Sequence, residues 1–315
     1  MALLVVFALT SNAHIGVQYQ MQLGNPTDAK PDARDHQHYL IQRTVFAEDY
    51  DDQTGEPNWV SWDLTAEDIG PTKRTPTFHA DSELPASFHH IKSADYRQSG
   101  FDRGHMCPSA DRSDDATDNA EVFAMSNIIP QSKDNNEGVW EKLERDCRTW
   151  AEQGNELLII CGPAGFNGTH LNGYDPVMVP SHTWKIIVEV PNGQGPVLSR
   201  ISTSTRVVAV DIPNTDGVRD DPWTKYLVSV NQLEALTGYH FFTALSPDVS
   251  AVLKAKIDGQ PTPSISYAKA AATSSQRATP QQMPSGTTIA LAIVFILLVL
   301  CAWLLIVFLR STAKK

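Results

Sequence analysis

Five segments of the chain have hydrophobic positions arranged as in β-strands. Each is rich in β-branched or aromatic residues and is bounded by Gly, Pro or Asn, which is typical of strands that are partly or fully buried. The segments are 38–46, 59–64, 157–161, 183–190 and 206–212. The pattern predicts one β-strand in each of these five segments.

Helical periodicity is clearest in residues 138–153, and Gly154 ends the run. Apolar side chains recur there every three or four residues, as on one face of a helix. They are Trp140, Leu143, Cys147, Trp150 and Ala151. A second helix is predicted from near Val230 to Gly238. Because strands and helices mix without regular βαβ alternation, we expect an α+β fold.

The longest apolar segment is 289–309, which contains no charged residue. At a rise of about 1.5 Å per residue, a helix of this length crosses a hydrocarbon core of ~30 Å. Arg310, Lys314 and Lys315 follow it directly. By the positive-inside rule we predict a single-pass membrane protein, with a cytoplasmic tail at 310–315 and an extracytoplasmic (periplasmic or extracellular) domain upstream. A buried core helix is the alternative.

Two other segments flank the expected folded domain at 14–259. Residues 1–13 combine a short apolar run with small residues, so we expect a signal peptide, although no Lys or Arg precedes the run. A first core strand, or a start codon assigned too far downstream, is the alternative. Residues 260–288 are rich in Pro, Ser, Thr, Ala and Gln and contain no acidic residue. This composition predicts a flexible linker.

Composition and charge limit what the domain can bind. The chain has 315 residues and a formal net charge of −11, which excludes a polybasic, histone-like nucleic-acid binder. Any attraction to an anionic polymer must therefore come from a few placed cations or from a metal ion. Upstream of the apolar segment are Cys107, Cys147 and Cys161, so at most one disulfide can form there. Cys147 lies on the apolar stripe of the predicted helix and is expected in the core.

The stretch 100–105, Gly-Phe-Asp-Arg-Gly-His, carries residues suited to catalysis. Asp102, Arg103 and His105 place a carboxylate, a permanent cation and a titratable base within four residues. An imidazole, with an ordinary pKa of ~6.5, is a suitable general base near neutral pH, and a guanidinium matches the oxygens of a phosphate. A purely structural role is the alternative for His105.

A second stretch, 125–144, places oxygen-bearing side chains before the predicted long helix. They are Asn127, Gln131, Asp134, Asn135 and Asn136. Such a group is also typical of a helix cap, so the two interpretations stay open.

Glu144 falls on the edge of the apolar side of the helix, and a carboxylate turned inward needs a partner. Asn136 and Glu144 lie roughly 12 Å apart along a helix axis, too far to ligate one ion together. This favours Asn136 as the direct ligand of a hydrated Mg²⁺ and Glu144 as a contact of the ion's waters. A salt bridge from Glu144 to an arginine is the alternative.

The order DRGH, SNIIPQ and NNEG-x-W-x-x-L-E resembles that of the DNA/RNA non-specific endonucleases of the ββα-metal type. The resemblance runs from about residue 40 to about residue 244. It implies the ββα-metal nuclease fold: a central, mostly antiparallel sheet flanked by helices, with the histidine on a strand and the metal ligand at the start of the next long helix. It also implies Mg²⁺-dependent hydrolysis of phosphodiester bonds, with Mn²⁺ as a substitute.

The resemblance assigns roles to five side chains. His105 resembles the general base, Asn136 the single protein ligand of the metal, and Glu144 the carboxylate that orients metal-bound water. Arg103 resembles a phosphate-contacting arginine. Arg74 resembles a further one, in a stretch that matches the family less specifically.

Three other motif residues are expected to support the site. Asn127 and Gln131 match motif positions and would hold the site in place. Asp102 would tether a backbone group or an arginine.

We therefore expect a membrane-tethered, metal-dependent endonuclease that cleaves DNA and RNA without sequence or sugar preference. Its substrates would bind through their phosphate backbone, the membrane would bind 289–309, and a homodimer is compatible with the sequence. One alternative is a non-catalytic tethered module that binds nucleic acid or another phosphate-bearing ligand. The other is a zinc site, although the spacings of its candidate ligands match no zinc-finger pattern. Those candidates are His79, His89, His90, Cys107 and Cys161.

Overall fold

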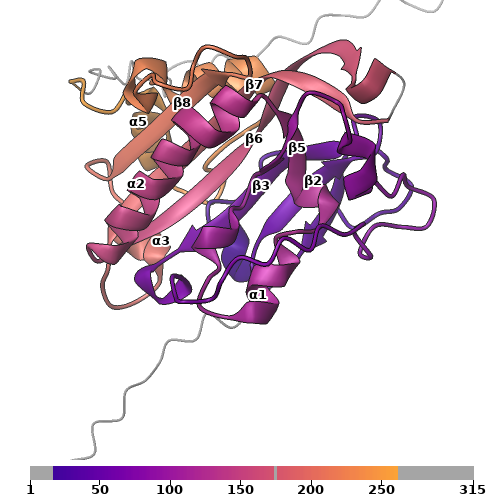
Figure 1. The fold of residues 1–315 in the computed structure, drawn as a ribbon. Helices are drawn as coiled ribbons and strands as arrows, with labels where there is room; N and C mark the ends of the chain where they lie inside the picture. Colours follow the sequence, from indigo (N-terminus) through magenta and orange to yellow (C-terminus); the bar gives the residue numbers. More distant parts are fainter. Residues whose placement is uncertain (1–16, 174–175, 262–315) are drawn as a thin grey trace, which may run out of the picture. The chain divides into compact units, whose positions relative to one another are not determined.

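The computed structural model describes residues 17–173 and 176–261 of the chain (Figure 1). Within these residues a six-stranded antiparallel sheet has the order β1-β2-β3-β6-β7-β8, and β4 pairs with β5 in a separate two-stranded ribbon. The strands are β1 (Tyr39–Gln42), β2 (Ala47–Asp51), β3 (Glu56–Leu64), β4 (Asp102–His105), β5 (Ile128–Gln131), β6 (Asn155–His170), β7 (Met178–Pro191) and β8 (Arg206–Pro213).

Helices cover both faces of the large sheet. They are α1 (Ala116–Glu121), α2 (Glu141–Glu152), α3 (Val197–Arg200), α4 (Val230–Thr237) and α5 (Pro247–Ala255). Figure 1 shows α2 in front of the sheet and α5 behind it. Together with the antiparallel pairing, this arrangement confirms the predicted α+β class.

The two faces follow from side-chain alternation along β6. Leu157 and Ile159 share a buried apolar cluster with side chains of α2. Leu158 and Ile160, which point the other way, share a second cluster with side chains of α4 and α5. Each such buried side chain stabilises the fold by about 1.5–3 kcal/mol relative to an exposed one. The sheet is therefore a central layer buried on both faces, and α2 packs against one of them.

The long helix predicted over 138–153 is confirmed, but it begins differently from an ordinary α-helix. A π-helical turn, Asn135–Trp140, leads into α2, and Gly138 within it has φ −119° and ψ −106°, outside the helical region. A Cβ atom on Gly138 would lie 2.6 Å from the Cα of Arg219. Glycine thus permits close approach of another chain segment at the turn that carries Asn136. Such π-turns are frequent at functional sites.

The prediction of one strand over 38–46 is wrong. β1 ends at Gln42, a turn is closed by the Arg43 N–H donating to the Phe46 carbonyl at 2.9 Å, and β2 begins at Ala47. Val45 and Phe46 are apolar because they are buried in this turn, so the pattern did not reveal it. The other four predicted strands and the helix near Val230 are confirmed.

Four predicted segments fall wholly or mainly outside the described residues. They are the signal peptide 1–13, the linker 260–288 apart from its first two residues, the membrane helix 289–309 and the tail 310–315. Among the described helices, none has the length and apolar character needed to cross a bilayer.

We expect Gly138→Ala to destabilise the protein by about 1–3 kcal/mol, because the new methyl group would overlap the backbone at Arg219. Thermal unfolding measures the effect. Gly193→Ala is the matched control, since the nearest atom to its Cβ would be the flexible Arg200 Cδ at 3.2 Å. Equal melting temperatures of the two variants would contradict the close approach at Gly138.

Candidate active site

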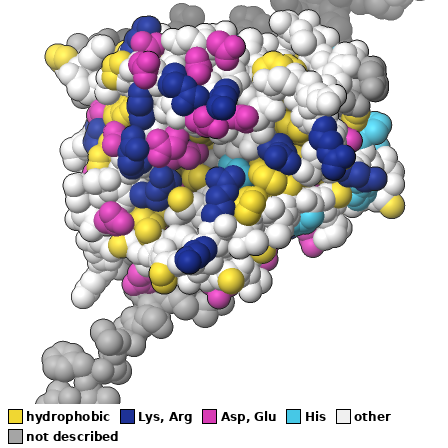
Figure 2. All heavy atoms as spheres, viewed as in Figure 1, with side chains coloured by type: hydrophobic (Ala, Val, Ile, Leu, Met, Phe, Trp, Pro, Cys, Tyr) yellow, Lys and Arg dark blue, Asp and Glu magenta, His cyan; other side chains and the backbone are white. Residues whose placement is uncertain are grey.

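A cleft of about 360 Å³ is lined by the start of α2, by β4 and by the loop that follows β4. It contains all five side chains to which the sequence assigned roles in catalysis or metal binding. They are Arg74, Arg103, His105, Asn136 and Glu144. Figure 2 shows dark blue Lys and Arg side chains around the middle of this face, with magenta acidic side chains beside them.

Asn127 fixes the chain directly after His105. His105 ends β4 and pairs with Ile128 of β5. The fully buried Asn127 accepts a hydrogen bond from the Cys107 N–H and donates one to the Cys107 carbonyl, both at 2.9 Å. These two bonds hold the backbone beyond His105 in one conformation, which is the supporting position expected for Asn127.

Gln131 connects the ribbon to the π-turn. Its amide donates to the Asn135 side-chain oxygen at 2.8 Å, and Asn135 in turn donates to Thr183 Oγ1 at 2.9 Å. The Gln131 side chain crosses over Gly104, where a Cβ atom would lie 1.8 Å from Gln131 Oε1. Glycine in the DRGH motif therefore makes room for the glutamine that supports the turn bearing Asn136.

The imidazole of His105 is enclosed by aromatic rings and is only 8% exposed. It packs perpendicular to Phe123 with centroids 4.9 Å apart, and against Phe78 at 5.4 Å. Its Nε2 atom is buried without a hydrogen-bond partner among the described residues. Burial, and then the charges of Arg74 and Arg103, lower the pKa of His105 to about 3. The ring is therefore neutral at physiological pH.

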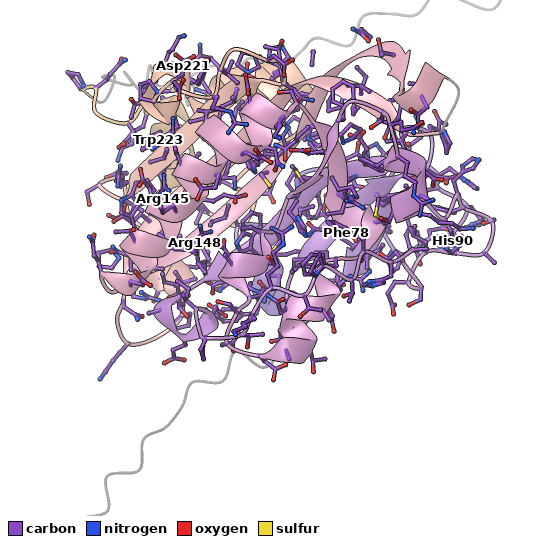
Figure 3. The ribbon with its side chains drawn as sticks, viewed as in Figure 1. Phe78, His90, Arg145, Arg148, Asp221 and Trp223 are labelled. Atoms are coloured by element: carbon purple, nitrogen blue, oxygen red, sulfur yellow. The ribbon has the colours of Figure 1, made fainter. Side chains whose placement is uncertain are left out.

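The rings of Phe78 and Phe123 also contact the guanidinium groups of the two arginines. The Arg103 guanidinium lies 4.5 Å from the centroid of Phe78 and donates to Ser93 Oγ, and Arg74 lies 5.4 Å from the centroid of Phe123. Contact of a cation with a ring face orients these long side chains. Sequence reasoning missed both phenylalanines, because an isolated aromatic residue is more often only a core residue. Figure 3 labels Phe78.

Asp102 orients the amide of Asn136. The Asn136 Nδ2 atom donates to Asp102 Oδ2 at 3.0 Å, so its Oδ1 is the end left to accept a contact in the cleft. Asp102 is thus a tether, as expected, but its partner is this amide and not an arginine or backbone group. An amide oxygen turned into a polar cleft fits a hard divalent cation.

Glu144 also lines the cleft, and its side chain is 11% exposed. Its Oε1 atom is 3.7 Å from Nζ of Lys185, which comes from β7 and is 1% exposed. The ammonium group also lies 4.1 Å from the Trp140 ring and 5.3 Å from the Trp62 ring. Burial raises the pKa of Glu144 to about 7, against the attraction of Lys185. The partner expected for Glu144 was a hydrated metal ion or an arginine, and the charged group in direct contact with it is the ammonium of Lys185.

Arg148 of α2 also lines the cleft, although sequence reasoning did not assign it to the site. It is 17% exposed and donates to Asp111 Oδ1 at 3.0 Å. The other carboxylate oxygen of Asp111 accepts from Trp62 Nε1 at 3.1 Å. Arg148 is labelled on α2 in Figure 3. Sequence reasoning missed Lys185 and Asp111; the only signal for Lys185 was a charge within the mostly apolar predicted strand 183–190, which also contains Glu189.

The described residues lend no support to a zinc site or a disulfide. Cys107, Cys147 and Cys161 are buried free thiols, and Cys147 lies in the core as predicted. Across 17–173 and 176–261, no three or more His, Cys, Asp or Glu side chains are arranged to hold a metal ion. The metal site expected at Asn136 would have one asparagine as its protein ligand, so it is not a group of this kind.

Residues 23–248 match the family model described as DNA/RNA non-specific endonuclease. The chain belongs to this endonuclease family. The resemblance seen in the three motifs is thereby confirmed, and the chain is a nuclease of the hydrolase class.

Individual relatives agree with this membership. A nuclease of Nostoc sp. (strain PCC 7120) is 41% identical over 242 residues, which is 77% of this chain and 87% of that protein. The mitochondrial nuclease EXOG of Homo sapiens is 31% identical over 217 residues, 64% of this chain and 56% of that protein. The solved EndoG/EndoGI complex has a TM-score of 0.64 at 23% identity, covering 78% of this chain and 98% of that one, and shows the same fold.

We expect His105 to stay neutral down to about pH 4. Its folded-state pKa of about 3 lies below the usual 6.5, so unfolding takes up a proton. The stability that depends on this group is present above pH 6.5 and is lost as pH falls toward 3. A ring NMR titration of the metal-free protein, with free imidazole in the same tube as reference, measures the pKa directly. A midpoint at pH 6 or above would contradict the burial argument.

Lys185→Met is expected to destabilise the protein by about 3–5 kcal/mol at pH 8, because Glu144 is then buried without its cation. At pH 5 the loss is smaller, since a carboxyl with a pKa near 7 is protonated there. Adding Glu144→Gln should recover most of the loss. Denaturant unfolding at the two pH values measures this, and a loss independent of pH would show that the charge pair is not its cause.

Proposed function

We propose that this nuclease cleaves internal phosphodiester bonds of DNA and RNA by water attack, with a Mg²⁺ ion held by Asn136. The observation that carries the proposal is that the neutral imidazole of His105 and the amide of Asn136 line one cleft of about 360 Å³. A base and an oxygen ligand can there face the same phosphate.

His105 is proposed as the general base. A neutral ring accepts a proton from water, but Arg74 and Arg103 disfavour the imidazolium that results. A substrate phosphate bound to these two arginines offsets their charge. Substrate binding would therefore raise the pKa of His105 toward neutrality, so that the base becomes stronger when a phosphate is present.

The residues of the cleft fit a partly hydrated divalent ion. Asn136 would hold it through Oδ1, with its other amide atom engaged by Asp102, and Glu144 would accept hydrogen bonds from its waters. When bound, the ion supplies charge stabilisation to the phosphate oxygens of the transition state. Oxygen ligands favour Mg²⁺ and accept Mn²⁺ as a substitute.

The arginines of the cleft explain the expected lack of sequence preference. Guanidinium groups that contact backbone phosphates carry no base information. Attack by water does not need a 2′-hydroxyl group, so DNA and RNA are both substrates. A non-catalytic binding module is less consistent with the site, because all five functional positions hold chemically competent residues in one cleft.

We also propose that the nuclease domain is extracytoplasmic and tethered by a membrane helix at 289–309. The uncharged length of that segment and the basic tail at 310–315 support this. The homodimer stays a prediction.

His105→Ala is expected to lower the rate of supercoiled-plasmid and RNA cleavage by about 10²–10⁴-fold, the usual range for loss of a general base. DNA binding, measured in EDTA, should change little. His240→Ala is the control, because this exposed histidine does not line the cleft.

The same assay tests the metal. EDTA should abolish wild-type cleavage and excess Mg²⁺ should restore it. Full activity of His105→Ala, purified free of host nuclease, would refute the assigned base, and activity that survives EDTA would refute the metal.

A further inference from the structure

Most arginines of the described residues are paired with carboxylates. Arg34, Arg43, Arg112, Arg145, Arg148, Arg200, Arg206 and Arg219 each form a salt bridge. Among residues 17–173 and 176–261, only Arg74, Arg97 and Arg103 form none. In a chain with a net charge of −11, these three guanidinium groups keep their charge available for an external anion.

The three unpaired arginines line two neighbouring hollows. Arg74 and Arg103 line the catalytic cleft. Arg103 also lines a second hollow of about 130 Å³, with Arg97 on its wall. The other residues of that hollow are Ser93, Tyr96, Phe101 and Asp102. Because Arg103 belongs to both, an extended anionic chain can pass from one hollow to the other along it.

The loop that carries Arg97 is held in place. Tyr96 is buried and its hydroxyl donates to the Ile128 carbonyl at 3.4 Å, and the Arg97 N–H donates to the Ala94 carbonyl at 3.1 Å. Gln98 has a φ of +59° and Gly100 one of +83°. A non-glycine residue in this left-handed region persists only where its surroundings enforce it. Arg97 is therefore presented from a fixed turn.

Asp102 is the acidic group in this hollow, and its charge opposes an anion there. Its Oδ2 atom already accepts a hydrogen bond from Asn136. Arg97 and Arg103 outnumber it, so the hollow still carries net positive charge. Phe101 adds half-buried apolar surface against which a sugar or base can pack.

We propose that this second hollow binds the backbone phosphate next to the scissile one on the same strand, with Arg97 as its partner. The proposal rests on the proposed nuclease function and adds a substrate subsite to it. A guanidinium fork suits a phosphate diester geometrically. The site makes the enzyme prefer oligonucleotides to substrates that hold a single phosphodiester.

The test is the salt dependence of DNA binding by the full-length protein in EDTA, measured by anisotropy of a fluorescein-labelled duplex. Arg97→Ala is expected to weaken binding roughly tenfold at 0.1 M salt and to make the log–log salt slope shallower by about one, since one phosphate contact is lost. Arg97→Lys should keep the slope and lose part of the affinity.

Lys254→Ala is the matched control. Lys254 lies on α5, which covers the face of the sheet opposite α2, and pairs with Glu234 at 2.7 Å. This variant should bind DNA with wild-type affinity and slope. Arg97→Ala with the slope and affinity of Lys254→Ala would overturn the proposal.

Cleavage with Mg²⁺ separates this proposal from the nuclease function. The ratio of kcat/KM for DNA to that for bis(p-nitrophenyl) phosphate should fall about tenfold in Arg97→Ala. An equal loss on both substrates would overturn the subsite, because it would mean that Arg97 supports the cleft itself. A wild-type protein that binds DNA but cleaves nothing would refute the nuclease function, whereas the binding slopes would still decide the role of Arg97.

Discussion

The site depends on an imidazole that is largely buried at the edge of the cleft and uncharged. Phe78 and Phe123 enclose the ring of His105, and the neighbouring arginines oppose its protonation. The same two aromatic rings also make cation–π contacts with those arginines. In the proposed mechanism, a phosphate attracted to these cations would bind beside His105 and relieve the repulsion that lowers its pKa. Packing, charge and proton transfer are coupled through one small aromatic cluster.

The remaining architecture keeps this cluster in the same cleft as the amide of Asn136. The β4–β5 ribbon supplies His105, the π-turn before α2 supplies Asn136, and Gln131 links the two through Asn135. This arrangement requires glycine at 104 and 138, because a Cβ atom there would overlap Gln131 and Arg219 respectively. Lys185 of β7 forms an ion pair with the carboxylate of Glu144 on α2, which lines the same cleft. Precision in the cleft thus comes from contacts among segments far apart in the sequence.

Local pattern was enough to predict the main helix and four strands, and the resemblance of the three motifs to a nuclease family named the five residues that line the cleft. Alternation and helical periodicity indicate which side chains are buried, and the burial of those side chains stabilises these elements. The turn at 43–46 was not predicted, because its apolar residues are buried in the same way as those of a strand. Sequence reasoning also missed Lys185, Asp111 and the two phenylalanines, because their contacts form only when distant segments of the chain pack together. The position of Glu144 at the edge of the apolar side of the helix was visible in the sequence, but its lysine partner was not.

Chemical rescue of His105→Ala by free imidazole tests the central claim most directly. Removing the ring leaves space beside Phe78 and Phe123 that an imidazole molecule can fill. If the neutral ring accepts the proton of the attacking water, added imidazole should restore DNA cleavage in proportion to its unprotonated fraction, so the rescued rate rises with pH until that form predominates. No rescue in a variant that still binds DNA and metal, or rescue that follows the protonated form, would contradict the assignment.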